Sequence, residues 1–225
     1  NDINSPWTNA GKMTNTGIDI GITTYNIQKN GFSWKTNFVF SHYNNILNEL
    51  NDASASIRGY KEYGDAVLVT NTMVGQPVGT FYGYVTDGLF RTMEDLNKDG
   101  AKQGLDVKPT GTWLGDVRYK DLNGDGVIDS KDVTIIGNPN PDFTYGITNT
   151  FNYKGFDFSI FLNGSQGGQI LNYTRRLTEG MTNPYWNQLA TVLDRYTSTN
   201  TNATLPRYNQ WHNNNFRVSD RFVED

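Results

Sequence analysis

Residues 144–165 read TYGITNTFNYKGFDFSIFLNGS, and apolar and polar side chains alternate along almost the whole stretch. Such alternation predicts a β-strand with one apolar face. The apolar positions are Tyr145, Ile147, Phe151 and Tyr153, followed by Phe156, Phe158, Ile160 and Leu162. The opposite positions of the second half are Asp157, Ser159 and Asn163, with Phe161 as the exception. Two strands joined at Lys154-Gly155 therefore predict a hairpin over 144–165.

A second hairpin of the same design is expected near the start of the chain, over residues 17–42. Its two halves flank Asn30-Gly31, a dipeptide that favours the tight turn of a hairpin. The alternating apolar residues are Ile18, Ile20 and Ile22 before the turn, and Phe32, Trp34, Phe38 and Phe40 after it. Aromatic residues near the ends of the expected strands are typical of the girdles of a membrane barrel.

The segment before the hairpin over 144–165 has the spacing of a calcium loop. Twelve residues, 121–132, place oxygen-bearing side chains at positions 1, 3, 5, 9 and 12, a glycine at position 6 and a backbone carbonyl at position 7. The expected ligands are Asp121, Asn123, Asp125, the Val127 carbonyl, Asp129 and Asp132. A solvated turn would also use Asp, Asn and Gly, and Mg²⁺ is the closest rival metal. Because no imidazole or thiolate is nearby, we expect structural Ca²⁺.

The connections between the expected strands are either very short or very long. Residues 43–143 and 166–216 form the long ones, and a further strand is expected to start within 217–225. Short turns on one side and long loops on the other are typical of outer-membrane barrels. The first long connection contains a glycine- and aromatic-rich run at 75–90, which we interpret as loop core. The second is expected to hold one helix, capped by Asn183 and extending to about Tyr196.

Composition limits the classes of function. The 225 residues carry a net charge of −4 and contain no cysteine, and the sequence pI near 5.2 argues against nucleic-acid binding. No apolar run is long enough for a spanning helix, so only β-strands could cross a membrane. The two histidines, His42 and His212, sit in no ligand or nucleophile motif. We therefore predict that the chain is not an enzyme.

Together these patterns predict an all-β chain. It would be a fragment of a large antiparallel transmembrane β-barrel with long extracellular loops, one short helix and a calcium loop. A soluble β-domain also shows alternation. The alternative is therefore a calcium-stabilised glycan-binding or adhesion domain on the cell surface, whose apolar faces would pack against a protein core instead of lipid.

Five stretches carry a resemblance to a known family. They are NAGKMTNTGIDIGI (9–22), GQPVGTFYGYVTDGLF (75–90), GDVRYKDLNGDGVIDSKD (115–132), IGNPNPDFTYGITNTFNYKGFDFSIFLNGSQGG (136–168) and NNNFRVSDRFVED (213–225). In these stretches the chain resembles the C-terminal part of a SusC/RagA-type TonB-linked outer-membrane transporter. Residues 43–74 and 169–207 match weakly, as variable extracellular loops would.

The resemblance implies a location in the bacterial outer membrane and a role in nutrient import. It implies a barrel of 22 strands with a plug, of which this chain holds only a part. Its implied partners are TonB, reached through an N-terminal part not present here, a SusD-type lipoprotein that acts as a lid, and outer-membrane lipid. The implied substrates are oligosaccharides or peptides, and the residues that would choose between them are mostly absent.

Overall fold

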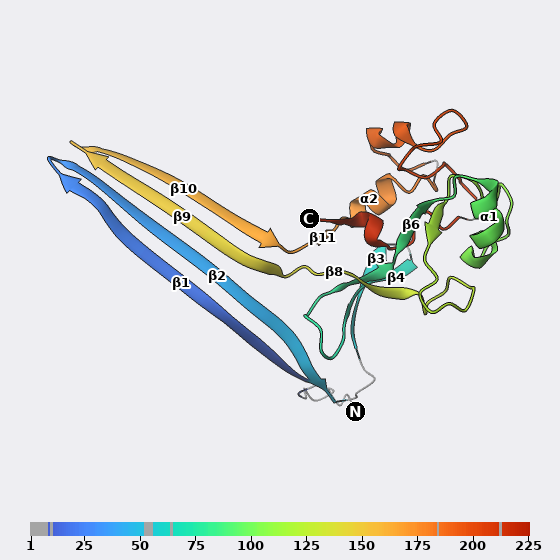
Figure 1. Cartoon of the computed structure of the whole chain (residues 1–225), viewed down its shortest axis with the longest axis horizontal. Helices are drawn as coiled ribbons and strands as arrows, with labels where there is room; N and C mark the ends of the chain where they lie inside the picture. The colour runs from blue at the N-terminus through green and yellow to red at the C-terminus, as the bar shows by residue number, and fades with distance from the viewer. Residues whose placement is uncertain (1–8, 10, 52–55, 64, 184, 212) are drawn as a thin grey trace, which may run out of the picture.

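The chain consists of a long single-layer sheet and a loop domain at one end of it (Figure 1). The computed structural model describes residues 9, 11–51, 56–63, 65–183, 185–211 and 213–225. The sheet contains, in spatial order, β1 (Gly11–Lys29), β2 (Phe32–Leu50), β9 (Pro141–Tyr153) and β10 (Phe156–Gly167). All neighbouring strands are antiparallel. About ninety residues therefore separate two strands that pair directly, β2 and β9.

Both hairpins turn through two residues with left-handed backbone. Asn30 and Gly31 have φ of 55° and 76°, and Lys154 and Gly155 have φ of 46° and 88°. Positive φ at both central residues defines the type I′ turn, whose twist matches that of the flanking strands. These two turns set the register within each hairpin.

The first hairpin is longer than the expected 17–42, because β1 and β2 each contain 19 residues. Polar pairs extend the ladder beyond the apolar alternation. The Asn48 side chain donates to Thr14 Oγ1 at 2.5 Å, and the Asn45 side chain donates to Asn15 Oδ1. Cross-strand amide and hydroxyl bonds thus help to extend the strands beyond the alternating apolar residues. The second hairpin is also extended, since β10 includes the glycine-rich run as far as Gly167.

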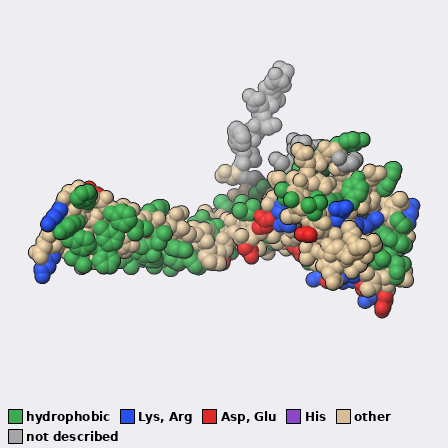
Figure 2. All heavy atoms as spheres, turned by 90° about the horizontal axis from the view of Figure 1, so that it is seen from above, with side chains coloured by type: hydrophobic (Ala, Val, Ile, Leu, Met, Phe, Trp, Pro, Cys, Tyr) green, Lys and Arg blue, Asp and Glu red, His purple; other side chains and the backbone are tan. Residues whose placement is uncertain are grey.

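The register places most of the aromatic and branched apolar side chains of the four strands on one face. Ile20 pairs with Phe40, which pairs with Tyr145, and Trp34 pairs with Phe151, which pairs with Phe158. The rings of Trp34 and Phe151 stack with centres 5.7 Å apart, and those of Phe151 and Phe158 with centres 6.1 Å apart. Figure 2 shows hydrophobic side chains gathered along this sheet. The chain does not cover them, since Phe158 remains 60% exposed.

One polar cluster interrupts this apolar face. Asn149 lies on this face, and its side-chain oxygen Oδ1 accepts hydrogen bonds from Trp34 Nε1 at 3.0 Å and from Thr36 Oγ1 at 2.7 Å. Asn26, at the β-bulge between Tyr25 and Ile27, donates to the same threonine at 2.7 Å. The polar groups therefore satisfy one another, as any polar group facing lipid must.

The opposite face of the sheet carries mostly small and polar side chains, and Phe161 is one of its few large apolar ones. This side chain lies over Gly146, where an added Cβ would stand 3.5 Å from the Phe161 ring and 3.0 Å from Val39. An aromatic side chain that covers a glycine on the neighbouring strand protects its backbone. Phe161 is thus an exception to the alternation because it fills the space that Gly146 leaves open.

The loop domain, residues 56–137 and 170–225, contains short strands and helices. One sheet pairs β3 (Ile57–Tyr63), β4 (Asp65–Thr72), β5 (Phe81–Tyr84) and β8 (Val133–Gly137). Two-stranded pairs join β6 (Thr86–Leu89) to β7 (Val117–Tyr119), and β11 (Ile170–Leu171) to β12 (Val223–Glu224). The helices are α1 (Met93–Asp99) and α2 (Tyr173–Thr178), with 3₁₀ turns at Ala101–Gln103, Ala190–Asp194 and Asp220–Phe222. No described helix is long and apolar enough to cross a membrane.

The hydrophobic core lies in the loop domain and not in the long sheet. Its main cluster consists of Leu89, Val117, Tyr119, Ile128, Tyr196 and Ala203. Phe90 and Leu96 are also fully buried. The aromatic run at 75–90 therefore supplies core residues, as expected, in Phe90 and in Tyr84, which packs against the main cluster.

The prediction of a helix after Asn183 is wrong. The Asn183 side chain accepts a hydrogen bond from the Tyr185 amide, but the backbone does not continue as a helix. Leu189 is extended, with φ −72° and ψ 152°, and its amide donates to the Thr178 carbonyl at 3.2 Å. This tertiary hydrogen bond replaces a helical one, so only the 3₁₀ turn at Ala190–Asp194 forms. Pro184 lies outside the described residues.

Residues 138–140 form one of the connections between the loop domain and the long sheet. β8 ends at Gly137 and β9 begins at Pro141. The Asn138 amide donates to Gln169 Oε1 at 3.2 Å, and the Gln169 amide donates back to the Asn138 carbonyl at 2.8 Å. The connection is thus fixed from the side by the residues that follow β10.

Candidate functional site

The predicted calcium loop links β7 to β8, and no helix follows it. Asp132 is fully buried, and its carboxylate accepts hydrogen bonds from the amides of Leu122 at 2.8 Å and Asp129 at 2.9 Å. The loop is anchored to the core by Ile128, which is 2% exposed and whose amide donates to the Lys102 carbonyl. Position 8 of the loop thus packs into the main cluster.

The other side chains of the loop bond mainly to its own backbone. Asp121 accepts from the amides of Gly124 at 2.7 Å and Gly126 at 2.9 Å, and Asp125 accepts from the Val127 amide at 3.0 Å. The Asn123 side chain donates to Asp125 at 2.9 Å. These two donors, the Val127 amide first, hold the pKa of Asp125 below its ordinary value.

The donor set fits a hard cation, since it combines carboxylates with an amide oxygen and a backbone carbonyl. In the part of the chain that the structure describes, however, no three acidic, histidine or cysteine side chains are grouped to hold a metal ion. The metal therefore stays a prediction.

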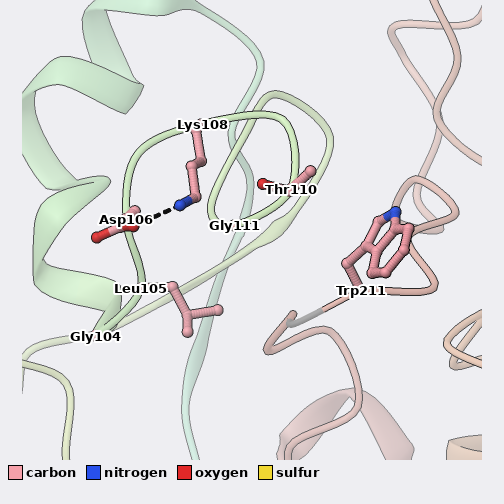
Figure 3. Close-up of a pocket in the computed structure, with 7 residues that line it drawn as sticks. All are labelled: Gly104, Leu105, Asp106, Lys108, Thr110, Gly111 and Trp211. Atoms are coloured by element: carbon pink, nitrogen blue, oxygen red, sulfur yellow. Dashed lines mark hydrogen bonds and ion pairs between the residues drawn. The ribbon is translucent and has the colours of Figure 1, made fainter.

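An open pocket of about 500 Å³ lies between residues 104–111 and Trp211 (Figure 3). The indole of Trp211 is 63% exposed and forms one wall. The other wall carries Leu105, Thr110 and an ion pair in which Lys108 Nζ stands 2.7 Å from Asp106 Oδ2. An apolar ring opposite polar side chains can hold a ligand that has both an apolar face and hydrogen-bonding groups.

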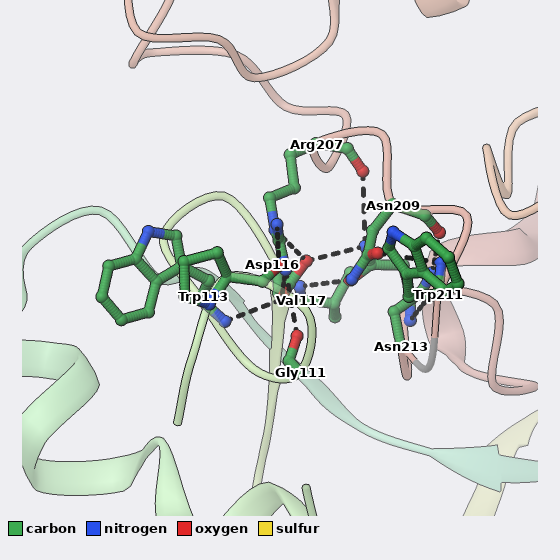
Figure 4. Close-up of polar contacts among 10 residues, drawn as sticks. Gly111, Trp113, Asp116, Val117, Arg207, Asn209, Trp211 and Asn213 are labelled. Carbon is green, nitrogen blue, oxygen red and sulfur yellow. Dashed lines mark hydrogen bonds and ion pairs between the residues drawn. The ribbon is translucent and has the colours of Figure 1, made fainter. Parts of the chain in front are cut away.

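A buried polar network supports the 104–111 wall (Figure 4). Arg207 donates from Nε and Nη2 to the two carboxylate oxygens of Asp116, at 2.8 Å each. The same guanidinium donates to the carbonyls of Pro109 at 2.7 Å and Gly111 at 3.0 Å. Because Asp116 is 4% exposed, this bidentate pair fixes the shape of the 104–111 loop.

The network continues to Trp211. Asn215 donates to Asp116 Oδ1 at 3.0 Å, and its own amide donates to Asn213 Oδ1 at 2.9 Å. The Trp211 amide donates to the Asn209 side chain at 3.0 Å, and Asn213 donates to the Asn209 carbonyl. Both walls of the pocket are therefore held by one set of hydrogen bonds.

His42 lies in β2 and Asp95 lies in α1, and neither lines the pocket. The His42 ring is on the long sheet and contacts the Asp142 carbonyl through Nδ1, and His212 lies outside the described residues. Asp95 lies in α1, where its amide donates to the capping Thr92 side chain at 3.1 Å. Residues 95–99 thus belong to helix α1.

Comparison with known proteins identifies the family. TonB-dependent receptor P3 of Formosa agariphila is 32% identical over 228 residues, which covers 99% of this chain and 21% of the relative. The chain belongs to the TonB-dependent receptor family. TonB-dependent receptor SusC of Bacteroides thetaiotaomicron is 27% identical over 162 residues, covering 72% of this chain and 15% of SusC. No protein-family model matches.

A solved structure of the RagAB peptide transporter has the same fold. It superposes with a TM-score of 0.71 at 18% identity, covering 98% of this chain and 22% of that chain. The predicted resemblance and the all-β barrel-fragment fold are thus confirmed. This TonB-dependent receptor chain is an outer-membrane protein, and it spans about a fifth of the length of the curated relatives it matches. The relatives are named as receptors and not as enzymes.

Sequence reasoning did not find the pocket or its network. Asp116 and Arg207 are 91 residues apart, and neither lies in a periodic pattern. The available signal was the run of asparagines at 213–215, whose amide groups are frequent partners of buried backbone and carboxylate groups.

Proposed function

We propose that this chain is part of an importer that takes up oligosaccharides or peptides through the outer membrane with energy from TonB. The observation that carries the proposal is the uncovered apolar face of the long sheet, joined to a folded loop domain at one end. In an adhesion domain that face would be packed against protein, whereas Phe156 is 80% exposed. The relatives named SusC and RagAB support the same class.

Uptake in cells tests this function. Labelled oligosaccharides and labelled peptides are offered separately to cells with and without the gene, and to cells that lack TonB. We expect uptake of one ligand class to depend on both the gene and TonB. Uptake that continues without TonB would contradict import by this route.

We further propose that the loop domain contacts a SusD-type lipoprotein through residues 182–198. Although the expected helix is absent, this stretch exposes large apolar side chains, with Tyr185 at 92% and Leu193 at 76%. Exposed apolar patches of this kind are typical of protein contacts. Deleting residues 182–198 should abolish recovery of the lipoprotein in a pull-down from the intact receptor. Met93→Ser, at an exposed residue of α1, is the control and should leave recovery unchanged.

We also propose that the loop from Asp121 to Asp132 binds one structural Ca²⁺. The spacing of its oxygen donors and the burial of Asp132 support this assignment. Asp121→Ala or Asp125→Ala should increase protease cleavage within 116–143 in millimolar calcium, while the hairpin over 144–165 stays intact. Asp106→Ala, an exposed acid outside the loop, is the matched control. Equal protease sensitivity with calcium and with chelator would exclude the metal.

A further inference from the structure

A second cavity, of about 340 Å³, lies between β4, β5, the start of β8, α2 and the segment before the last 3₁₀ turn. Its apolar walls include Val67, Val133 and Val218. Two arginines, Arg176 and Arg217, also line it, and none of its lining residues is acidic. The lack of acidic residues is specific to this cavity, because the chain as a whole contains 23 acidic and 19 basic residues.

Arg176 is held by aromatic rings and neutral oxygens. Its guanidinium carbon lies 5.0 Å from the ring centres of both Tyr173 and Phe216. Nε donates to the Phe216 carbonyl, and Nη1 donates to the Tyr173 hydroxyl at 2.8 Å. Arg176 is 9% exposed, and burial lowers the pKa of its guanidinium.

Arg217, which also lines the cavity, is held in the same way. Its guanidinium carbon stands 4.8 Å from the ring centre of Tyr84 and 5.6 Å from that of Tyr119. Nη1 donates to the Ile128 carbonyl at 3.3 Å, and Nη2 donates to the Gln103 carbonyl at 3.4 Å. Carbonyl oxygens satisfy hydrogen bonds, but they do not neutralise a cation.

The two guanidinium groups have no direct carboxylate partner among the described residues, although Asp129 and Asp132 lie near the Tyr84 ring on which Arg217 stacks. Among the described residues, no carboxylate forms a salt bridge with Arg176 or Arg217. In the same part of the chain, Nη2 of Arg176 and Nε of Arg217 donate no hydrogen bond. Partly buried cations without a counter-ion are unfavourable, and the cavity is open to solvent, so an anion that enters it relieves the cost.

We propose that this cavity binds a carboxylate of an incoming ligand. The planar fork of arginine suits a carboxylate, which can accept two parallel hydrogen bonds. The valine walls and the Tyr82 ring would contact the part of the ligand next to the acid. The inference rests on the proposed function for the source of the ligand, which is either the C-terminus of a short peptide or a uronic acid of an oligosaccharide.

Calorimetry on the purified full-length receptor in detergent tests the binding. The probes are trialanine, trialanine amide, digalacturonate and digalactose. We expect heat of binding from trialanine, from digalacturonate or from both, and none from the two probes that lack a carboxylate. The trialanine and digalacturonate arms distinguish a peptide source from a saccharide source. Binding of neither acid, or equal binding of the neutral probes, would overturn the proposal.

Variants link the binding to this cavity. Val67→Glu places a carboxylate in the wall as an internal counter-ion and should weaken binding of the acid probe at least about tenfold. Val74→Glu makes the same change at a residue that is 42% exposed and does not line the cavity, so it should bind as the parent does. Arg176→Gln keeps hydrogen-bonding capacity and should also lose binding. Unchanged affinity in Val67→Glu and Arg176→Gln would place any binding elsewhere.

The two proposals fail separately. Calorimetry needs neither TonB nor transport, whereas uptake in cells needs both. Acid-selective binding without TonB-dependent uptake would leave the cavity assignment standing and contradict import. TonB-dependent uptake without acid-selective binding would contradict the cavity assignment alone.

Discussion

Removing the Asp116 carboxylate should open the 104–111 loop. Asp116 accepts hydrogen bonds from Arg207 Nε and Nη2 at 2.8 Å each, from the Asn215 side chain at 3.0 Å and from the Trp113 amide at 2.8 Å. In Asp116→Ala all of these donors lose their acceptor and the guanidinium becomes an unpaired, largely buried charge. Loss of one partner of a buried ion pair costs about 3–5 kcal/mol.

Amide hydrogen exchange on the intact receptor measures this loss. A tenfold change in an equilibrium corresponds to about 1.4 kcal/mol, so protection over residues 104–117 should fall about a hundredfold or more. The Gly115 amide, which donates to the Phe90 carbonyl at 2.7 Å, is a suitable reporter. Protection in the long sheet should not change, since no described residue of the network lies there.

Asp106→Ala provides the matched control. Asp106 belongs to the same loop and also pairs with a cation, but its side chain is 77% exposed. Water replaces the lost partner at such a site, so protection should stay at the parent value. If Asp116→Ala kept protection within about threefold of the parent, the network would not be what fixes the loop, and the reasoning from burial would be refuted.

Three further outcomes are expected. Phe158→Arg should destabilise the assembled barrel by about 2–4 kcal/mol near the bilayer midplane, and Ser159→Arg much less. Equal folding yields of the two variants in lipid vesicles would contradict the assignment of Phe158 to the lipid-facing side. Burial raises the pKa of Tyr119 well above its ordinary value, so its contribution to stability is fully present below about pH 10 and is lost as pH rises further, by up to about 1.4 kcal/mol per unit. Tyr119→Phe should therefore flatten the alkaline part of a pH–stability curve of the receptor. Gly155→Ala should destabilise the hairpin by about 1 kcal/mol, because the φ of 88° at this position is unfavourable for alanine. Gly155→Asn should be better tolerated, and equal refolding yields of the two variants would contradict the turn assignment.

The hairpins were predictable because their determinants are local. Alternation with a period of two, together with Asn30-Gly31 and Lys154-Gly155, fixes strand, face and turn without reference to distant residues. The strand ends were not predictable, since polar pairs such as Asn48 with Thr14 extend the ladder and carry no periodic signal.

The helix after Asn183 shows why local signals fail in the loop domain. The capping residue and the apolar spacing both favour a helix, but the hydrogen bond from Leu189 to Thr178 holds the backbone extended. The pocket depended even more on distant contacts, because Arg207 meets Asp116 across 91 positions of sequence. The spacing of the loop from Asp121 to Asp132 was visible in the sequence because all of its expected ligands lie within twelve consecutive residues.

The three-residue joint between β8 and β9 has a mechanical consequence. Pro139 and Pro141 have restricted φ, and Asn138 is clamped to Gln169, so the joint contains no free hinge. Tilting the loop domain would therefore bend β9 and break its ladder hydrogen bonds. A motion of the loop domain relative to the long sheet would therefore require a bend outside residues 138–140.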